Sequence, residues 1–315
     1  MPRDISSLSI MSIKTFSQNN LTWINIDKID EESLSYLKKN YQFHHLDYED
    51  LLSEQQVPRI DSYPDYLFII LKFPYWQEEE NEIIEHEVDI FVGNDFLITI
   101  QHSQSKEIKD FFYRCMNNRK IKEDWLSSPG VLLYRLIDGL FENTGPILNH
   151  MGKEIDNLEH EIYQGAQGFE IIKKLSIYRR NILHFRRIID PQKYLINNLS
   201  NIKRSFIDES LKIYFDDISD DLNKIWTVIE TYKETINGLH VTVESFINRR
   251  TSKLISSLTV ISVSLLPLNL LAGMYGMNID KLPFARNPIL VWLMFGLFGG
   301  LIILIILIMR KKKML

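Results

Sequence analysis

The chain has little of what secreted proteins, nucleic-acid-binding proteins and metalloenzymes depend on. Its one cysteine, Cys115, excludes an internal disulfide and is typical of a reducing compartment. No basic and then apolar leader opens the sequence, so no secretory signal is predicted. The net charge of -5 argues against a nucleic-acid partner, which would require a basic face. None of the eight histidines stands at metal-ligand spacing from a cysteine or glutamate.

Catalytic motifs are absent from the sequence as well. It has no nucleophile motif, no phosphate-binding glycine loop and no evident pair of catalytic carboxylates, so no enzyme activity is predicted. A glutamate-rich stretch, Glu78 to Glu87, separates two apolar runs. We interpret it as a solvated loop or sheet edge rather than a binding site.

Residues 1–125 have the pattern of a cytosolic α/β domain. Short apolar runs predict strands, and a turn pair at Gly93-Asn94 predicts a hairpin. Asp30 or Ser33 is placed to cap a helix that runs through Tyr41. The predicted elements are strands at 21–26 and 66–73, the hairpin at 88–100, and helices at 30–41 and 106–122.

The strand pattern ends near Ser127, and residues 126–206 predict a cytosolic helical hairpin. Its first helix begins at Ser127-Ser128-Pro129, a capping serine followed by proline, and continues to Tyr163. Glycines at 165 and 168 end that helix. The second helix covers 169–198, with an interruption or kink predicted at Pro191.

A third helix is predicted from 207 to 278, first as a stalk and then as a membrane span at about 253–276. A second span follows at 289–309, which has no charged residue, and about 20 apolar residues suffice to cross a bilayer. The connector 279–288 lies between the spans, and residues 310–315 form a basic tail. Basic residues bracket both outer ends of the pair of spans, which predicts a multi-pass protein of the cytoplasmic (inner) membrane with both termini cytosolic and the connector outside.

The first span carries an unusual polar stripe. Residues that recur at spacings of three and four along one side of the helix are Ser252, Ile255, Thr259, Ser262, Leu266, Asn269, Gly273 and Gly276. Polar side chains at membrane depth usually face a bundle interior or water, which favours a pore wall. The alternative is close helix packing, with serine hydroxyls bonded to their own backbone.

A family resemblance follows from the order of these segments and from three motifs. The first span ends in LLPLNLLAGMYGMN, similar to MPLTFIAGIYGMN, and YFDDISDDL (214–222) is similar to YFRDVYDHL. GMN at the end of a span, followed by a second span and a basic tail, is specific. Over essentially its whole length the chain resembles the CorA-type magnesium transporters of the CorA/ZntB-like superfamily.

The resemblance implies an α+β membrane protein that assembles as a homopentameric funnel. Five first spans would line the pore, with Gly276, Met277 and Asn278 as the selectivity filter. Ile255 and Leu258 match the family's hydrophobic constriction, which can gate by dewetting. The alternatives are a helix C-cap for the glycine and asparagine, and ordinary packing for the two apolar residues. The pore-lining set is then Ser252, Ile255, Leu258, Thr259, Ser262, Leu266, Asn269 and Gly273.

An acidic cluster near the start of the long helix is the second candidate site. It consists of Asp216, Asp217, Asp220 and Asp221, which repel one another at spacings of four residues. The resemblance implies a regulatory Mg²⁺ site at a subunit interface, with Asp217 at the position of the family's acidic ligand. A solvated helix face is the alternative.

The connector departs from the family pattern and leaves the transported ion open. Where the family has MPEL, this chain has LPFA (282–285), more like the ZntB-type zinc transporters. We therefore expect a divalent-cation channel or transporter for Mg²⁺ influx, gated by cytosolic Mg²⁺, with Zn²⁺ or Co²⁺ as alternative ions. A membrane-anchored helical scaffold or sensor that does not conduct is an alternative of another class.

Overall fold

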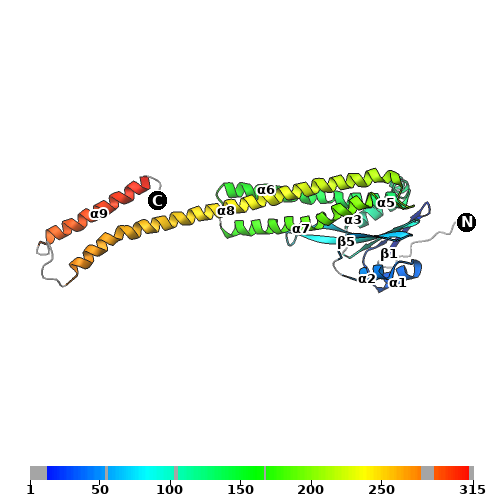
Figure 1. Cartoon of the computed structure of the whole chain (residues 1–315), viewed down its shortest axis with the longest axis horizontal. Coiled ribbons are helices and arrows are strands. Elements are labelled where there is room, and N and C mark those ends of the chain that lie inside the picture. The colour runs from blue at the N-terminus through cyan, green and yellow to red at the C-terminus, as the bar shows by residue number, and fades with distance from the viewer. Residues whose placement is uncertain (1–12, 54–55, 103–105, 167, 278–286, 312–315) are drawn as a thin grey trace. The chain divides into compact units, whose positions relative to one another are not determined.

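The computed structural model describes residues 13–53, 56–102, 106–166, 168–277 and 287–311. The chain divides into two compact units, residues 1–239 and 240–315. The helix α8 (Lys212–Tyr275) contributes residues to both units (Figure 1).

A six-stranded sheet forms the centre of the first unit. Its strands are β1 (Ile13–Gln18), β2 (Leu21–Ile26), β3 (Arg59–Ser62), β4 (Tyr66–Gln77), β5 (Glu82–Gly93) and β6 (Phe96–Gln101), in the order β1-β2-β6-β5-β4-β3. β2 and β6 are parallel, and every other neighbouring pair is antiparallel. The predicted strand at 21–26, the strand at 66–73 and the hairpin at 88–100 are confirmed.

The sheet is larger than the sequence predicted, since β1 and β3 were not predicted and β4 and β5 are longer than expected. The arms of the β4–β5 hairpin are each 12 residues long, so Glu82, Glu85 and Glu87 lie in a strand instead of a loop. The chain reverses direction between β4 and β5 at Asn81, whose φ is +57°. The first hairpin, β1–β2, turns at Asn19 and Asn20 with φ values of 48° and 68°, as a two-residue turn of this kind requires.

Two short helices cover one face of the sheet. α1 (Glu31–Asn40) and α2 (His45–Asp50) place Leu37 and Tyr48 against a core that includes Phe68, Phe91 and Ile100 (Figure 1). Asp30 and Ser33, predicted as alternative caps of α1, form a capping box together. The Ser33 backbone N–H donates to Asp30 at 2.7 Å, and the Asp30 N–H donates to the Ser33 hydroxyl at 2.9 Å.

Five helices follow β6: α3 (Lys106–Asn117), α4 (Arg119–Trp125), α5 (Pro129–Glu142), α6 (Thr144–Tyr163) and α7 (Phe169–Leu199). Two of the predicted helices are therefore wrong in extent, since each divides at an asparagine. Asn118 accepts hydrogen bonds from the first turn of α4. At the second break the Asn143 amide donates to Gly139 O at 3.0 Å, and the Thr144 hydroxyl donates to Phe141 O at 2.7 Å.

Residues 126–206 consequently contain three helices where the sequence predicted a pair. The predicted start is confirmed, because the Ser128 hydroxyl accepts from Val131 N at 3.2 Å and Pro129 occupies the first turn. The glycines at 165 and 168 separate α6 from α7, both with positive φ.

The interruption predicted at Pro191 is absent, and α7 continues through it as one helix. The adjacent residue explains why. Gln192 is buried and fastens α7 to β4: its side-chain oxygen accepts from Lys72 N at 3.0 Å, and its amide donates to Lys72 O at 2.5 Å. These bonds to the sheet stabilise the helix where proline removes one donor.

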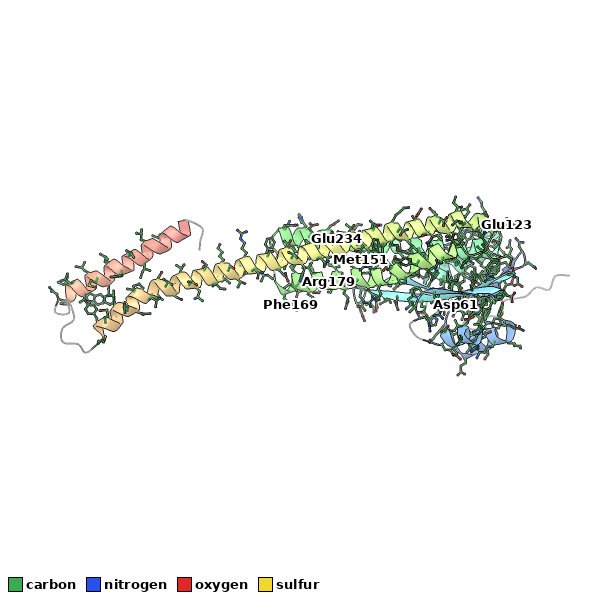
Figure 2. All side chains as sticks on the ribbon, in the orientation of Figure 1. Asp61, Glu123, Met151, Phe169, Arg179 and Glu234 are labelled. Carbon is green, nitrogen blue, oxygen red and sulfur yellow. The ribbon has the colours of Figure 1, made fainter. Side chains whose placement is uncertain are left out.

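The long helix α8 (Lys212–Tyr275) begins after a single 3₁₀ turn, η1 (Glu209–Leu211). Within the first unit its apolar face buries Phe215, Ile218 and Leu222 against the helical layer. The Glu230 carboxylate pairs with Arg186 of α7 at 2.6 Å. Figure 2 shows the side chains of this layer, including Met151 of α6, which is buried, and Phe169 at the first residue of α7, which is exposed.

The second unit contains the C-terminal part of α8 and the helix α9 (Pro288–Lys311). Among the described residues one helix, Glu209–Tyr275, is long and apolar enough to cross a membrane, with a mean hydropathy of 1.9 in its apolar window. The apolar part of α9 found by the same criterion is the shorter Pro288–Leu304.

Candidate functional site

The polar stripe lies on a continuous part of α8 and its members are exposed. Ser252, Thr259, Ser262, Asn269 and Gly273 all lie on the solvent-accessible surface of the single chain. The apolar members Ile255, Leu258 and Leu266 are also exposed, at 59%, 65% and 62%. The structure therefore brings the predicted pore-lining residues onto one open surface of the helix.

A second stripe on the same helix is half-buried. Its members are Ser256, Ser257, Val260, Ser264, Pro267, Leu268, Leu271 and Tyr275. At about 100° per residue, this set and the polar stripe lie on roughly opposite sides of α8. The Tyr275 hydroxyl contacts Met294 Sδ of α9 at 3.9 Å. The side of α8 that contacts α9 through Tyr275 also carries Ser256, Ser257 and Ser264, whereas Ser252, Thr259, Ser262 and Asn269 lie exposed on the other side.

Within the predicted span of α8, the hydroxyls of Ser257 and Thr259 bond to the helix backbone, as the packing alternative anticipated. Ser257 Oγ donates to Lys253 O and Thr259 Oγ1 donates to Ile255 O, both at 2.9 Å. Such bonds satisfy the hydroxyl hydrogen but leave the oxygen lone pairs available. At Thr259 the hydrogen bond to the backbone is therefore compatible both with close helix packing and with a pore wall.

The predicted filter falls at the edge of the described residues. α8 ends at Tyr275, where Gly276 N donates to Ala272 O at 2.9 Å and Met277 N donates to Met274 O at 3.3 Å. The glycine thus closes the last turn of the helix. Asn278, the connector to residue 286 and the tail residues 312–315 lie outside the described residues.

The four aspartates separate onto two sides of α8. Asp216 and Asp220 border a cavity of about 380 Å³ that α7 lines with Lys193, Tyr194 and Asn197. Lys212 pairs with Asp216 at 3.4 Å, which offsets part of the local negative charge. This pair of aspartates therefore has lysines as near neighbours.

The other two aspartates lie toward α5, where further carboxylates join them. Asp221 borders a cavity of about 240 Å³ together with Asp138 and Glu142. Burial raises the pKa of Asp138, and the negative charges of Glu142 and Asp217 raise it further. One lysine, Lys224, pairs with Asp221 at 2.6 Å. Asp138 and Glu142 were missed by the sequence analysis because they lie on a helix about 75 residues earlier, with no motif to link them.

The comparisons with known proteins agree with this architecture. The model of the family described as CorA-like Mg2+ transporter protein matches residues 18–311. The cobalt/magnesium transport protein CorA of Thermotoga maritima is 25% identical, over 99% of this chain and 89% of that protein. The fold is similar to the complete structure of the CorA magnesium transporter from Methanocaldococcus jannaschii, with a TM-score of 0.80 and 24% identity over 94% of this chain and 92% of that one.

A more distant likeness covers about three quarters of the chain. The cytoplasmic domain of ZntB from Vibrio parahaemolyticus has a TM-score of 0.61 and 16% identity, over 73% of this chain and 88% of that domain. The fold, the long apolar helix and the matching family model together define the class of this protein as a metal-ion transporter. The chain belongs to the CorA-like Mg²⁺ transporter family, whose members are transporters or channels and not enzymes.

Proposed function

We propose that five copies of this chain form a channel that carries Mg²⁺ into the cytosol across the cytoplasmic membrane, with both termini on the cytosolic side. The observation that carries the proposal is the exposed stripe of Ser252, Thr259, Ser262 and Asn269, opposite the side of α8 that α9 covers. In a bilayer these side chains would meet either water or another protein chain. Two helices per chain do not enclose a path, so conduction needs several copies around one axis.

Assembly as a homopentamer is supported by the family to which the chain belongs. With five copies, the polar stripes would face a common water-filled axis. Ile255 and Leu258, both exposed near the start of the stripe, would form an apolar ring that closes by dewetting. Leu266 would lie between the polar rings of Ser262 and Asn269, and Gly273 would lie between Asn269 and the outer mouth.

At the outer mouth, Gly276, Met277 and Asn278 would form the selectivity filter. Mg²⁺ holds its waters tightly and dehydrates reluctantly, so a ring of amides that bonds to the hydrated ion suits it. A ring of carboxylates would bind the ion more strongly and slow its release. Gly276 leaves room for this approach because it has no side chain.

Cytosolic Mg²⁺ would act at the aspartate cluster to stabilise the closed form. Asp217 and Asp221 lie toward Asp138 and Glu142, so four carboxylates gather near two cations, Lys224 and Arg135. A divalent cation would remove most of this repulsion. Asp216 and Asp220 would contribute on the α7 side, where Lys212 already pairs with Asp216.

Ion flux into liposomes that contain the purified protein tests this function. We expect Mg²⁺ influx driven by a negative interior potential, and a loss of more than about tenfold in Asn278→Ala, the cost of a hydrogen bond to a charged group. Met274→Leu, on the last turn of α8 and outside the stripe, is the matched control. Full flux in Asn278→Ala would rule out the filter role. A monomeric wild-type protein without flux would favour the scaffold alternative.

Zn²⁺ is the second candidate ion, and the connector motivates it. Leu282, Pro283, Phe284 and Ala285 replace the family's acidic loop, and 73% of the chain is similar in fold to the cytoplasmic domain of ZntB. Competition in the same liposomes decides between the ions, with Co²⁺ included. Flux of Mg²⁺ that excess Zn²⁺ leaves unchanged supports Mg²⁺, and Zn²⁺ flux in the presence of millimolar Mg²⁺ supports the alternative.

A further inference from the structure

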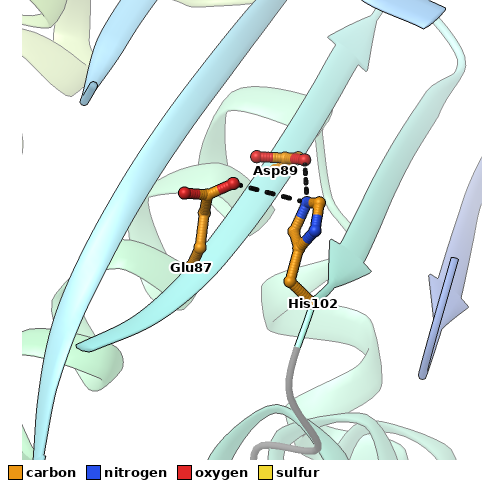
Figure 3. Close-up of side chains that lie close together, drawn as sticks. All are labelled: Glu87, Asp89 and His102. Atoms are coloured by element: carbon orange, nitrogen blue, oxygen red, sulfur yellow. Dashed lines mark hydrogen bonds and ion pairs between the residues drawn. The ribbon is translucent and has the colours of Figure 1, made fainter. Parts of the chain in front are cut away.

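Three polar side chains converge on one face of the sheet of the first unit. The register of β5 and β6 pairs Val88 with Gln101 and Asp89 with Ile100, which places position 102 opposite position 87. Residues 87 and 89 share a face because successive side chains on a strand alternate. His102, at the end of β6, therefore joins Glu87 and Asp89 in the core of the first unit (Figure 3).

The three side chains are close enough to share an ion. Their nearest ligand atoms all lie within 4.8 Å of one another. His102 Nε2 is 2.7 Å from Asp89 Oδ2 and 3.4 Å from Glu87 Oε1 (Figure 3). Asp89 is 1% exposed and Glu87 8%, so both carboxylates are held out of water.

The cluster leaves buried oxygens without a hydrogen bond. Asp89 Oδ1 and Glu87 Oε1 have no hydrogen-bond partner among the described residues, although Glu87 Oε1 faces the imidazole. A buried carboxylate oxygen without a donor costs free energy, which a coordinated cation would recover. Burial raises the pKa of Asp89, while its hydrogen bond with His102 opposes that rise.

The net charge of the side chains around the cluster also favours a divalent cation. Lys72, opposite Glu87 on β4, lies 3.6 Å from Glu87 Oε2 but makes its shorter contact, 2.7 Å, with Glu85. Together, the carboxylates of Glu85, Glu87 and Asp89 and the ammonium of Lys72 carry a charge of -2 when His102 is neutral. A divalent cation brings this group to zero, whereas protonation of His102 leaves it at -1.

We propose that Glu87, Asp89 and His102 bind one divalent transition-metal ion, of the class of Zn²⁺ or Co²⁺. Two carboxylate oxygens and one imidazole nitrogen suit these ions, with bonds of about 2.0–2.2 Å. The imidazole distinguishes the site from the oxygen-only ligands that Mg²⁺ prefers. The ion would take the place of the proton between His102 Nε2 and Asp89 Oδ2, and water would complete its coordination.

The site goes beyond the proposed transport function, because it lies in the sheet and not along the ion path. Bound metal would tie the end of β6 to the centre of β5. Bound metal should therefore raise the thermal stability of the first unit, which can be measured without any ion flux. Binding that survives in Asn278→Ala separates this proposal from the channel function.

The test is metal binding to the full-length protein in detergent with excess Mg²⁺, which saturates sites made only of oxygen ligands. Isothermal titration with Zn²⁺ should show one site per chain. Bound Co²⁺ should show the visible absorption of a low-symmetry site with nitrogen ligation. We expect His102→Ala and Asp89→Asn to weaken Zn²⁺ binding by more than about 100-fold, beyond the effect of losing an outer-shell partner. His86→Ala, which removes a histidine from β5 outside the cluster, should bind as the wild type does.

Wild-type protein that binds neither ion under these conditions overturns the proposal without reference to any variant. Equal Zn²⁺ affinity in His102→Ala and the wild type overturns it as well. If these substitutions impair folding, Glu87→Gln at the more accessible side of the cluster provides the second variant. Loss of the Zn²⁺-dependent rise in Tm in Glu87→Gln, with the metal-free Tm retained, supports the site, and an unchanged rise contradicts it.

Discussion

At the scale of single residues, Cys115 gives the simplest test of the first unit's core. Its thiol is fully buried on α3, and burial raises the pKa of the thiol to about 12. At pH 8 the folded protein would then carry about one thiolate per ten thousand molecules. We expect Cys115 to resist a thiol-specific reagent in native protein and to react promptly in denaturant. Fast labelling of native protein would contradict the buried position.

The same thiol makes a pH-dependent contribution to stability. The unfolded thiol ionises near its ordinary pKa of about 8.5, whereas the folded thiol keeps its proton to a higher pH. The contribution is therefore fully present below about pH 8.5 and decreases as pH rises toward 12. Denaturant unfolding at pH 7 and pH 10 should show a smaller loss in Cys115→Ala than in the wild type.

At the scale of elements, the contact between α5 and α3 depends on a glycine. A Cβ at Gly139 would lie within 1.9 Å of the Phe111 ring, which is 8% exposed and has little room to move. Gly139→Ala should lower the free energy of unfolding by about 1–3 kcal/mol through overpacking. Gly145→Ala on α6, where a Cβ meets nothing within 4 Å, is the control and should be neutral or stabilising by up to about 1 kcal/mol. Equal stability of the two variants would refute the close approach.

The sequence predicted those elements whose signals are local. Apolar runs predicted β2, β4 and β5–β6, and the pairs at Asp30–Ser33 and Ser128–Pro129 predicted two helix starts. The helix breaks at Asn118 and Asn143 were missed because asparagine is a weak breaker that acts here through its side-chain hydrogen bonds. The disruptive effect of Pro191 on α7 was overestimated, because Gln192 forms hydrogen bonds with β4, a strand 120 residues earlier in the sequence.

The sites follow the same division between local and long-range information. The polar stripe on α8 is helical periodicity and was predictable, and its role as a pore wall stays a prediction. Asp138 beside Asp217 and Asp221, and the grouping of Glu87, Asp89 and His102, depend on tertiary contacts and strand register. A correct hairpin register at 88–101 would have placed His102 opposite Glu87, and this was the signal available in the sequence.

At the scale of the whole molecule, the aspartate cluster should couple Mg²⁺ to the stability of the assembly. In the proposed closed form, a cation among Asp217, Asp221 and the carboxylates of α5 links the first unit to its neighbours. About millimolar Mg²⁺ should then slow limited proteolysis of the wild type, and Asp217→Ala should lose most of that protection. Glu234→Ala, on α8 outside the cluster, is the control. The same protection in Asp217→Ala and the wild type would exclude a sensor role for this residue.

The central claim is that the polar side of α8 faces a water-filled axis shared by several copies of the chain. Its most direct test is cysteine accessibility in the Cys115→Ala background, with Mg²⁺ flux as the readout. Cysteine at Thr259, Ser262 or Asn269 should react with a charged, membrane-impermeant thiol reagent and lose flux. Cysteine at Ile261 or Met274, which are exposed but lie off the stripe, should keep flux. Block at all five positions, or at none of them, would contradict the account.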